Sequence, residues 1–179
     1  MILLGSEISK ALADGKIVIS PYNESQLNPN SYDLRLGHKY LKYNDPILDA
    51  AKINSTETYR IPKEGLILMP NELYLMETQE ITETDHFVPG IEGRSSIGRL
   101  GINIHATAGF GDIGFAGTWT LEVFVKKPVR IYANMRICQV YFLMPCSKPE
   151  ERDLYKGKYI NQNMPRPSYI WKEREEWDI

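Results

Sequence analysis

Residues 93–122 hold the densest group of side chains that could do chemistry. Arg94, Ser95, Ser96 and Arg99 bring two guanidinium groups and two hydroxyls together in a turn rich in glycine. A guanidinium is a rigid fork of N–H donors that fits phosphate oxygens, and such a turn adds backbone N–H groups. The pattern indicates phosphate binding or, as the competing interpretation, a turn whose arginines serve a subunit interface. It is not a P-loop, because no GxxxxGK[ST] precedes a helix.

Two carboxylates in the same run are candidates for acid–base work. Glu122 lies in the middle of the strand-like TWTLEVFV, where a carboxylate is costly to bury unless it is paired or protonated. It is a general base if its face lines a cleft, and a solvated side chain if its face meets water. Asp112 lies in AGFGDIGFAG, where glycines permit close backbone approach to a ligand and Phe115 could stack on a base. The alternative for Asp112 is a turn-forming residue in a polar hairpin.

A metal site made by the protein is not expected. His38 and His105 have no second ligand at metal spacing, and Cys138 and Cys146 fit neither a CxxC motif nor a zinc knuckle. The HxE…PCxxC pattern of zinc deaminases is also missing. We therefore expect structural histidines and two free thiols.

The elements that position these residues are expected to be mostly strands. Residues 6–15 predict a short helix, capped by Ser6 and ended by Gly15, with Ile8 and Ala11 on one face. Residues 32–43, 65–81 and 118–127 alternate apolar and polar side chains, as strands do. Short strands at this spacing predict an all-β barrel or sandwich.

The composition excludes several classes of protein. The chain has 179 residues, and 21 Lys and Arg against 23 Asp and Glu give a net charge of −2, which argues against a protein that coats nucleic acid. No apolar run approaches the roughly 18 residues of a membrane span, and the N-terminus does not resemble a signal peptide. We therefore expect a soluble, cytoplasmic protein with no membrane partner.

The C-terminal region differs in composition from the rest of the chain. After Pro145 the sequence is charged and rich in proline, but it also carries several tyrosines and tryptophans. We expect one β domain over residues 1–163 and an arm over 164–179 that packs on a neighbour or folds over a ligand. A disordered tail is the alternative.

Five motifs together resemble the dCTP deaminase family, the deaminating branch of the trimeric dUTPase superfamily. The resemblance runs from about residue 3 to residue 170 and implies a distorted, jelly-roll-like β-barrel of the dUTPase type. It also implies a homotrimer with active sites between subunits. The motifs are NPNSYDLRLG (28–37), EGRSSIGRLG (92–101), HATAGFGDIGFAGTWTLE (105–122), RICQVYF (136–142) and GKYINQ (157–162).

The resemblance also implies catalytic roles. Glu122 would be the base for zinc-independent deamination of dCTP, with Ser95 and Arg99 holding the attacking water and the substrate. Asp112 resembles the residue with which the bifunctional members activate a second water against the α-phosphate, giving dUMP, pyrophosphate and ammonia. Mg²⁺ would bridge the phosphate oxygens instead of sitting in a protein cage.

The remaining implied roles are in substrate binding, with dCTP as the substrate and dUTP as a second candidate. The backbone around Ala106, Thr107 and Ala108 would contact the edge of the cytosine, and Phe115 would pack near the sugar. The implied triphosphate contacts are Arg94, Ser96, Gln139, Tyr155, Lys158 and Gln162.

Three residues depart from the family pattern. Gly111 replaces the usual aliphatic residue before Asp112, Ile113 replaces a small residue or proline, and Val125 stands where many relatives have Asn. A loop made flexible by glycine would displace Asp112. Two alternatives therefore stay open: a dUTPase or dual dUTP/dCTP diphosphatase without deamination, and a non-catalytic trimeric nucleotide-binding regulator.

Overall fold

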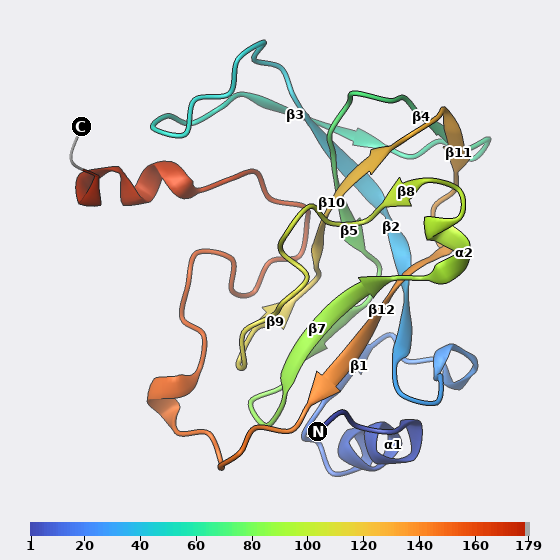
Figure 1. Ribbon diagram of the computed structural model, residues 1–179, viewed down its shortest axis with the longest axis vertical. Coiled ribbons are helices and arrows are strands. Elements are labelled where there is room, and N and C mark those ends of the chain that lie inside the picture. Colours follow the sequence, from blue (N-terminus) through green and yellow to red (C-terminus); the bar gives the residue numbers. More distant parts are fainter. Residues whose placement is uncertain (178–179) are drawn as a thin grey trace.

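A computed structural model describes residues 1–177, and most of its regular structure is strand (Figure 1). The main sheet has seven strands in the order β7-β12-β2-β5-β10-β8, with β3 paired to β2, and it curves into a nearly closed barrel. Its strands are β2 (Tyr32–Tyr43), β3 (Thr56–Arg60), β5 (Tyr74–Thr78), β7 (Val88–Gly93), β8 (Ile102–Asn103), β10 (Thr120–Val125) and β12 (Arg136–Leu143). The predicted all-β barrel is confirmed.

The remaining strands form two small sheets. One has the order β1-β6-β9 and the other pairs β11 with β4. Their strands are β1 (Val18–Ser20), β4 (Leu66–Leu68), β6 (Ile81–Glu83), β9 (Ala116–Gly117) and β11 (Val129–Ile131). The small sheet with β9 lies beside the C-terminal segment, because Gly117 also forms a bridge to Gln162.

The predicted N-terminal helix is present as α1 (Gly5–Ala13). Its start differs from the prediction: Leu4 is the N-cap residue, and its own N–H donates to Oε2 of Glu7 at 2.7 Å. Ser6 lies inside the helix and does not cap it. The Glu7 carboxylate instead satisfies the N–H of Leu4 at the helix start. Gly15 follows the helix with a φ of 69°, as predicted for its stop.

The other helical segments are short. They are η1 (Glu24–Gln26), α2 (Ser95–Gly98), η2 (Glu151–Asp153) and η3 (Ile170–Glu176). No helix within residues 1–177 has the length and apolar character needed to span a membrane.

Strand β10 shows how alternation builds the core. Leu121, Val123 and Val125 are buried, whereas Thr120 and Glu122 are only half-buried on the other face. This is the predicted alternation, and β10 pairs antiparallel with β5, where Glu122 lies opposite Leu75. The core side of β10 is therefore apolar, and its other side is free to carry polar side chains.

A buried carboxylate joins the turn before β6 to the middle of the barrel. Glu80 is completely buried. It accepts hydrogen bonds from the backbone N–H and Nε of Arg35, at 2.7 and 2.6 Å, and from Nε2 of Gln26 at 3.1 Å. Because both its oxygens have partners, the charge can stay inside the protein.

The C-terminal segment runs outside the barrel, past the first residue of β10. The backbone N–H of Thr118 donates to the carbonyl of Gln162 at 2.9 Å, and that of Arg166 donates to Oγ1 of Thr120 at 3.1 Å. Further along, Tyr169 stacks on Tyr159 with ring centroids 5.4 Å apart. The boundary expected between residues 163 and 164 stays a prediction.

Replacing Glu80 with Gln should lower the free energy of unfolding by about 3 kcal/mol, because it leaves the Arg35 guanidinium without its buried counter-ion. Chemical denaturation would measure this. The control is Glu72→Gln, which breaks the exposed ion pair with Lys42 and should change stability little. Equal effects of the two substitutions would contradict the importance of burial at Glu80.

Candidate active site

A cavity of about 400 Å³ opens between β10, the loop over residues 108–115 and the C-terminal segment. Among its lining residues are six of the predicted site residues: Ala108, Asp112, Phe115, Glu122, Tyr155 and Gln162. A cavity of this volume suits a nucleotide-sized ligand.

Glu122 reaches the cavity from the outward face of β10. Its Oε2 accepts a hydrogen bond from the backbone N–H of Ala106 at 2.9 Å. This bond fixes the carboxylate. It also places the predicted general base next to the segment that was predicted to contact the cytosine. Ala106, Thr107 and Ala108 are exposed, so their backbone groups are accessible to a ligand. Of the two open alternatives for Glu122, the cleft is the one observed.

Asp112 lies in the same cavity on an exposed part of the loop. The loop is attached to β7, because the N–H of Ile91 donates to the carbonyl of Gly109 at 2.8 Å and the N–H of Gly111 donates to that of Pro89 at 2.9 Å. Two backbone hydrogen bonds therefore attach the part of the loop before Asp112 to β7.

Aromatic side chains form one wall of the cavity. Phe115 is buried against Trp119 and Tyr155, with ring centroids 4.9 and 6.2 Å apart. Gln162 is also buried; its Nε2 donates to the carbonyl of Thr118 at 2.5 Å. Its Oε1 has no hydrogen-bond partner among the described residues. A buried oxygen without a partner is costly, so a water bound beside it would stabilise the wall.

Lys158 lies close to this wall but pairs with the C-terminal segment. Its Nζ donates a hydrogen bond to Oε1 of Glu173 in η3, and this bond raises the pKa of Lys158. The ammonium group is therefore held in its charged form.

The other predicted residues form a second group that does not line the cavity. Ser95, Ser96 and Arg99 are exposed on and beside α2, and Arg94 and Gln139 are half-buried nearby. In Figure 1, α2 lies on the opposite side of the barrel from the small sheet with β9 and the C-terminal segment. A single chain therefore does not bring Ser95 and Arg99 to Glu122.

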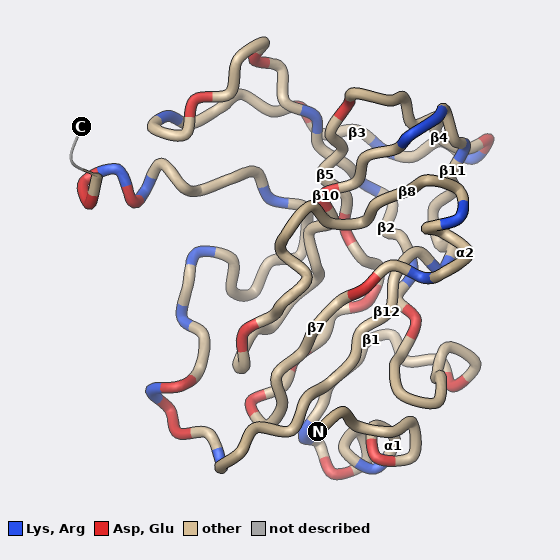
Figure 2. The backbone as a smooth tube through the Cα atoms, in the orientation of Figure 1, with Lys and Arg blue, Asp and Glu red and all other residues tan. Residues whose placement is uncertain are grey.

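Asp33 organises the second group and was not predicted. It is 2% exposed, and its Oδ1 lies 3.1 Å from Nε of Arg94 while its Oδ2 lies 3.4 Å from Nη1 of Arg136. Asn28 donates to the same carboxylate at 2.9 Å. One carboxylate thus serves two guanidinium groups, and positive charge gathers at α2 and the start of β12 (Figure 2). The sequence did carry a sign of it: Asp33 is a carboxylate within the strand-like motif YDLRLG, and a carboxylate in a strand-like run is also what identified Glu122.

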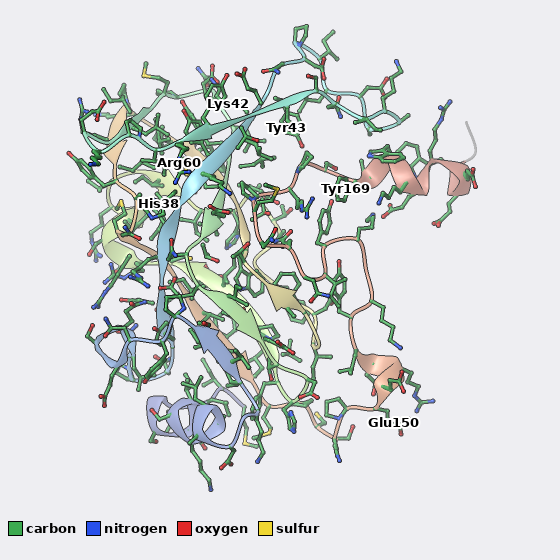
Figure 3. All side chains as sticks on the ribbon, turned by 180° about the vertical axis from the view of Figure 1, so that it is seen from behind. His38, Lys42, Tyr43, Arg60, Glu150 and Tyr169 are labelled. Atoms are coloured by element: carbon green, nitrogen blue, oxygen red, sulfur yellow. The ribbon has the colours of Figure 1, made fainter. Side chains whose placement is uncertain are left out.

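Sequence reasoning also missed part of the cavity wall. Tyr43 and Arg166 line it, and the Tyr43 hydroxyl accepts a hydrogen bond from the backbone N–H of Ser168 at 2.9 Å. Burial raises the pKa of Tyr43, and the nearby charge of Glu122 adds to this, so the hydroxyl stays protonated. Figure 3 shows Tyr43 at the end of β2 on the side where the C-terminal segment with Tyr169 runs.

Both cysteines are free, with Cys138 buried and Cys146 exposed. Within residues 1–177 no three His, Cys, Asp or Glu side chains are grouped so that they could hold a metal ion.

Comparisons with known proteins agree on one family. A family model described as dCTP deaminase-like matches residues 2–144. Proteins named "dCTP deaminase, dUMP-forming" are similar along nearly the whole chain. The one from Clostridium acetobutylicum is 50% identical over 173 residues, covering 97% of this chain and 98% of its own. That from Leptospira biflexa is 48% identical over 176 residues, covering 98% and 99%.

A solved structure shows the same fold. The 2′-deoxycytidine 5′-triphosphate deaminase from Agrobacterium tumefaciens superposes with a TM-score of 0.65 at 20% sequence identity, over 80% of this chain and 48% of that longer chain. The family match covers the barrel up to the end of β12, with Glu122, Asp112 and the residues at α2, but not Tyr155, Lys158 or Gln162. The chain therefore belongs to the dCTP deaminase-like family.

Proposed function

We propose that this protein deaminates dCTP and hydrolyses the resulting triphosphate, releasing ammonia, dUMP and pyrophosphate. The observation that carries the proposal is that Glu122, held by the N–H of Ala106, shares one cavity with Asp112. Relatives about half identical to the chain are named for dUMP-forming dCTP deamination. The two alternatives, hydrolysis without deamination and a regulator without catalysis, are not favoured by these relatives.

In the first reaction Glu122 acts as general base. It takes a proton from water, the hydroxide attacks C4 of the cytosine, and the proton passes to N3. The proton of the new C4 hydroxyl then passes to the amino group, the C4–N bond breaks, ammonia leaves, and C4 keeps the oxygen as a carbonyl. The fixed position of the carboxylate favours this step, because a base must lie within hydrogen-bond reach of its water.

In the second reaction Asp112 activates another water. That water attacks the α-phosphate, the bond between the α-phosphorus and the bridging oxygen breaks, and pyrophosphate leaves. Oxygen-bearing side chains in the lining, such as those of Asp112 and Glu122, suit the hydrated Mg²⁺ that accompanies a nucleoside triphosphate. Bound through the phosphates, Mg²⁺ would supply positive charge that lowers their repulsion of the attacking water.

The separation of the two groups of residues supports a homotrimer with shared sites. Ser95 and Arg99 are exposed on one side of the chain, while Glu122 lies in a cavity that they do not line. Leu100, beside Arg99, is 54% exposed, as an apolar interface residue would be in a free chain. A neighbouring copy would bring its Ser95 and Arg99 to the water and substrate beside Glu122.

The remaining binding roles follow from this arrangement. Arg94, Ser96 and Gln139 of the neighbour, with Tyr155, Lys158 and Gln162, would bind the triphosphate. The backbone of residues 106–108 would contact the cytosine, and Phe115 the sugar. Residues 164–179 would close over the bound nucleotide; of these, residues 178–179 lie outside the described part. Two free cysteines suit the reducing cytoplasm as the location, and dUTP is expected as a second substrate.

The Glu122→Gln protein should release ammonia from dCTP about 10³-fold more slowly, because an amide keeps the shape but cannot accept the water's proton. Ammonia assay and chromatography of dCTP, dUTP, dUMP and dCMP would measure it, with binding of dCTP as the control for folding. Formation of dCMP alone by the wild type would contradict deamination, and an unchanged rate in the variant would remove Glu122 from its role.

Mixed trimers test the shared site. The Glu122→Gln and Arg99→Ala chains should each be nearly inactive, but random mixing of equal amounts should restore about a quarter of the sites, since each needs Glu122 from one chain and Arg99 from the next. The control mixes Glu122→Gln with a Glu122→Gln/Arg99→Ala chain, which should recover nothing. No recovery in the first mixture, with trimers shown by light scattering, would place both residues on one chain.

Replacing Asp112 with Asn should shift the products from dUMP to dUTP, because the second water loses its base while Glu122 is unaffected. The dUTP:dUMP ratio from dCTP measures this directly. General damage to the loop would lower both products together, so a fall in rate with an unchanged ratio would contradict the role of Asp112.

A further inference from the structure

Gly111 lies where there is no room for a side chain. A Cβ atom on Gly111 would lie 2.4 Å from Cη2 of Trp119 and 2.9 Å from the carbonyl oxygen of Pro89. Gly111 is not one of the glycines with positive φ, so any residue could adopt its backbone conformation. The indole of Trp119 therefore occupies the volume that an aliphatic side chain at position 111 would fill.

Trp119 is itself held rigidly. Its Nε1 donates to Oγ1 of Thr82 at 2.9 Å, and its backbone N–H donates to Oγ1 of Thr78 at 3.0 Å. The ring is 7% exposed and packs on Phe115, the residue that ends the loop. The indole thus spans from strand β6 to the middle of the 108–115 loop.

We infer that Trp119 is a positioning residue: its indole fills the space where a side chain at position 111 would lie, and it thereby sets the position of Asp112. The inference rests on the proposed function, since it concerns the second of the two reactions. Asp112 follows Gly111 directly, so the edge of the indole limits how closely the loop can approach β10. A displacement of about 1 Å can cost about 10²-fold in rate, so this contact matters for the Asp112 carboxylate.

The test is a pair of substitutions and their combination. Gly111→Ala places a methyl group against the indole, and we expect the dUTP:dUMP ratio from dCTP to rise about 10²-fold. Trp119→Phe removes the outer edge of the indole and its bond to Thr82, and should raise the ratio about tenfold. In the double variant the methyl group can move into the vacated space, although it still meets the Pro89 carbonyl oxygen. The ratio should therefore rise clearly less than the roughly 10³-fold expected of independent effects.

The test has one control variant and outcomes that would overturn the inference. Phe142→Leu truncates an equally buried aromatic on β12 that does not line the cavity, and it should lower the melting temperature without changing the product ratio. A double variant as impaired as independent effects require, or a Trp119→Phe variant with the wild-type ratio, would overturn the inference. Wild-type protein that forms no dUMP would instead overturn the proposed function and the positioning role with it. In that case the melting temperatures of the two single variants and the double variant would still show, if their changes are not additive, that residues 111 and 119 compete for the same space.

Discussion

The period-two alternation of β10 is the constraint on which the site depends. Leu121 and Val123 must face the core, so Glu122 between them must face outward, and a register slip of one residue would bury the carboxylate instead. Just before the strand, Trp119 also packs inward and meets Gly111. One strand therefore places one carboxylate directly and, through the indole, limits the position of the other. Any change that shifts β10 against β5 would move both.

Among the buried carboxylates of residues 1–177, Glu80 and Asp33 are paired with arginines in different ways. Glu80 is completely buried and matched to a single guanidinium, that of Arg35, so this pair is neutral and serves the fold. Asp33 is shared by Arg94 and Arg136, which leaves one positive charge in excess next to α2. A phosphate group would balance that charge, and Asp33 keeps the guanidinium of Arg94 oriented before any anion arrives. Similar ion pairs thus stabilise the fold at one place and, under the proposed function, would orient a guanidinium for a phosphate at another.

Much of the fold and about half of the site could be predicted from the sequence. The strand alternation around Glu122 and the stop at Gly15 depend on neighbours in the chain, so local pattern was sufficient. The start of α1 was misassigned because Glu7 reaches back to Leu4, and a Ser at position 6 looked like the better cap. The roles of Asp33 and Trp119 depend on partners such as Arg136 and Thr82, which are far away in the sequence. No local pattern reports such contacts.

The division of residues between cavity and α2 also explains how one site could perform two reactions. The triphosphate is common to dCTP and dUTP, and the deamination changes only the base. Arg94 and Ser96 of a neighbouring chain, together with Tyr155 and Gln162, would bind that constant part. In the same cavity Glu122 would act on the base, which changes, and Asp112 on the α-phosphate. Tyr43 stays neutral beside Glu122, so its hydroxyl adds no negative charge next to the general base. The product of the first reaction would therefore remain bound by the same contacts as the substrate, already placed for the attack that Asp112 assists.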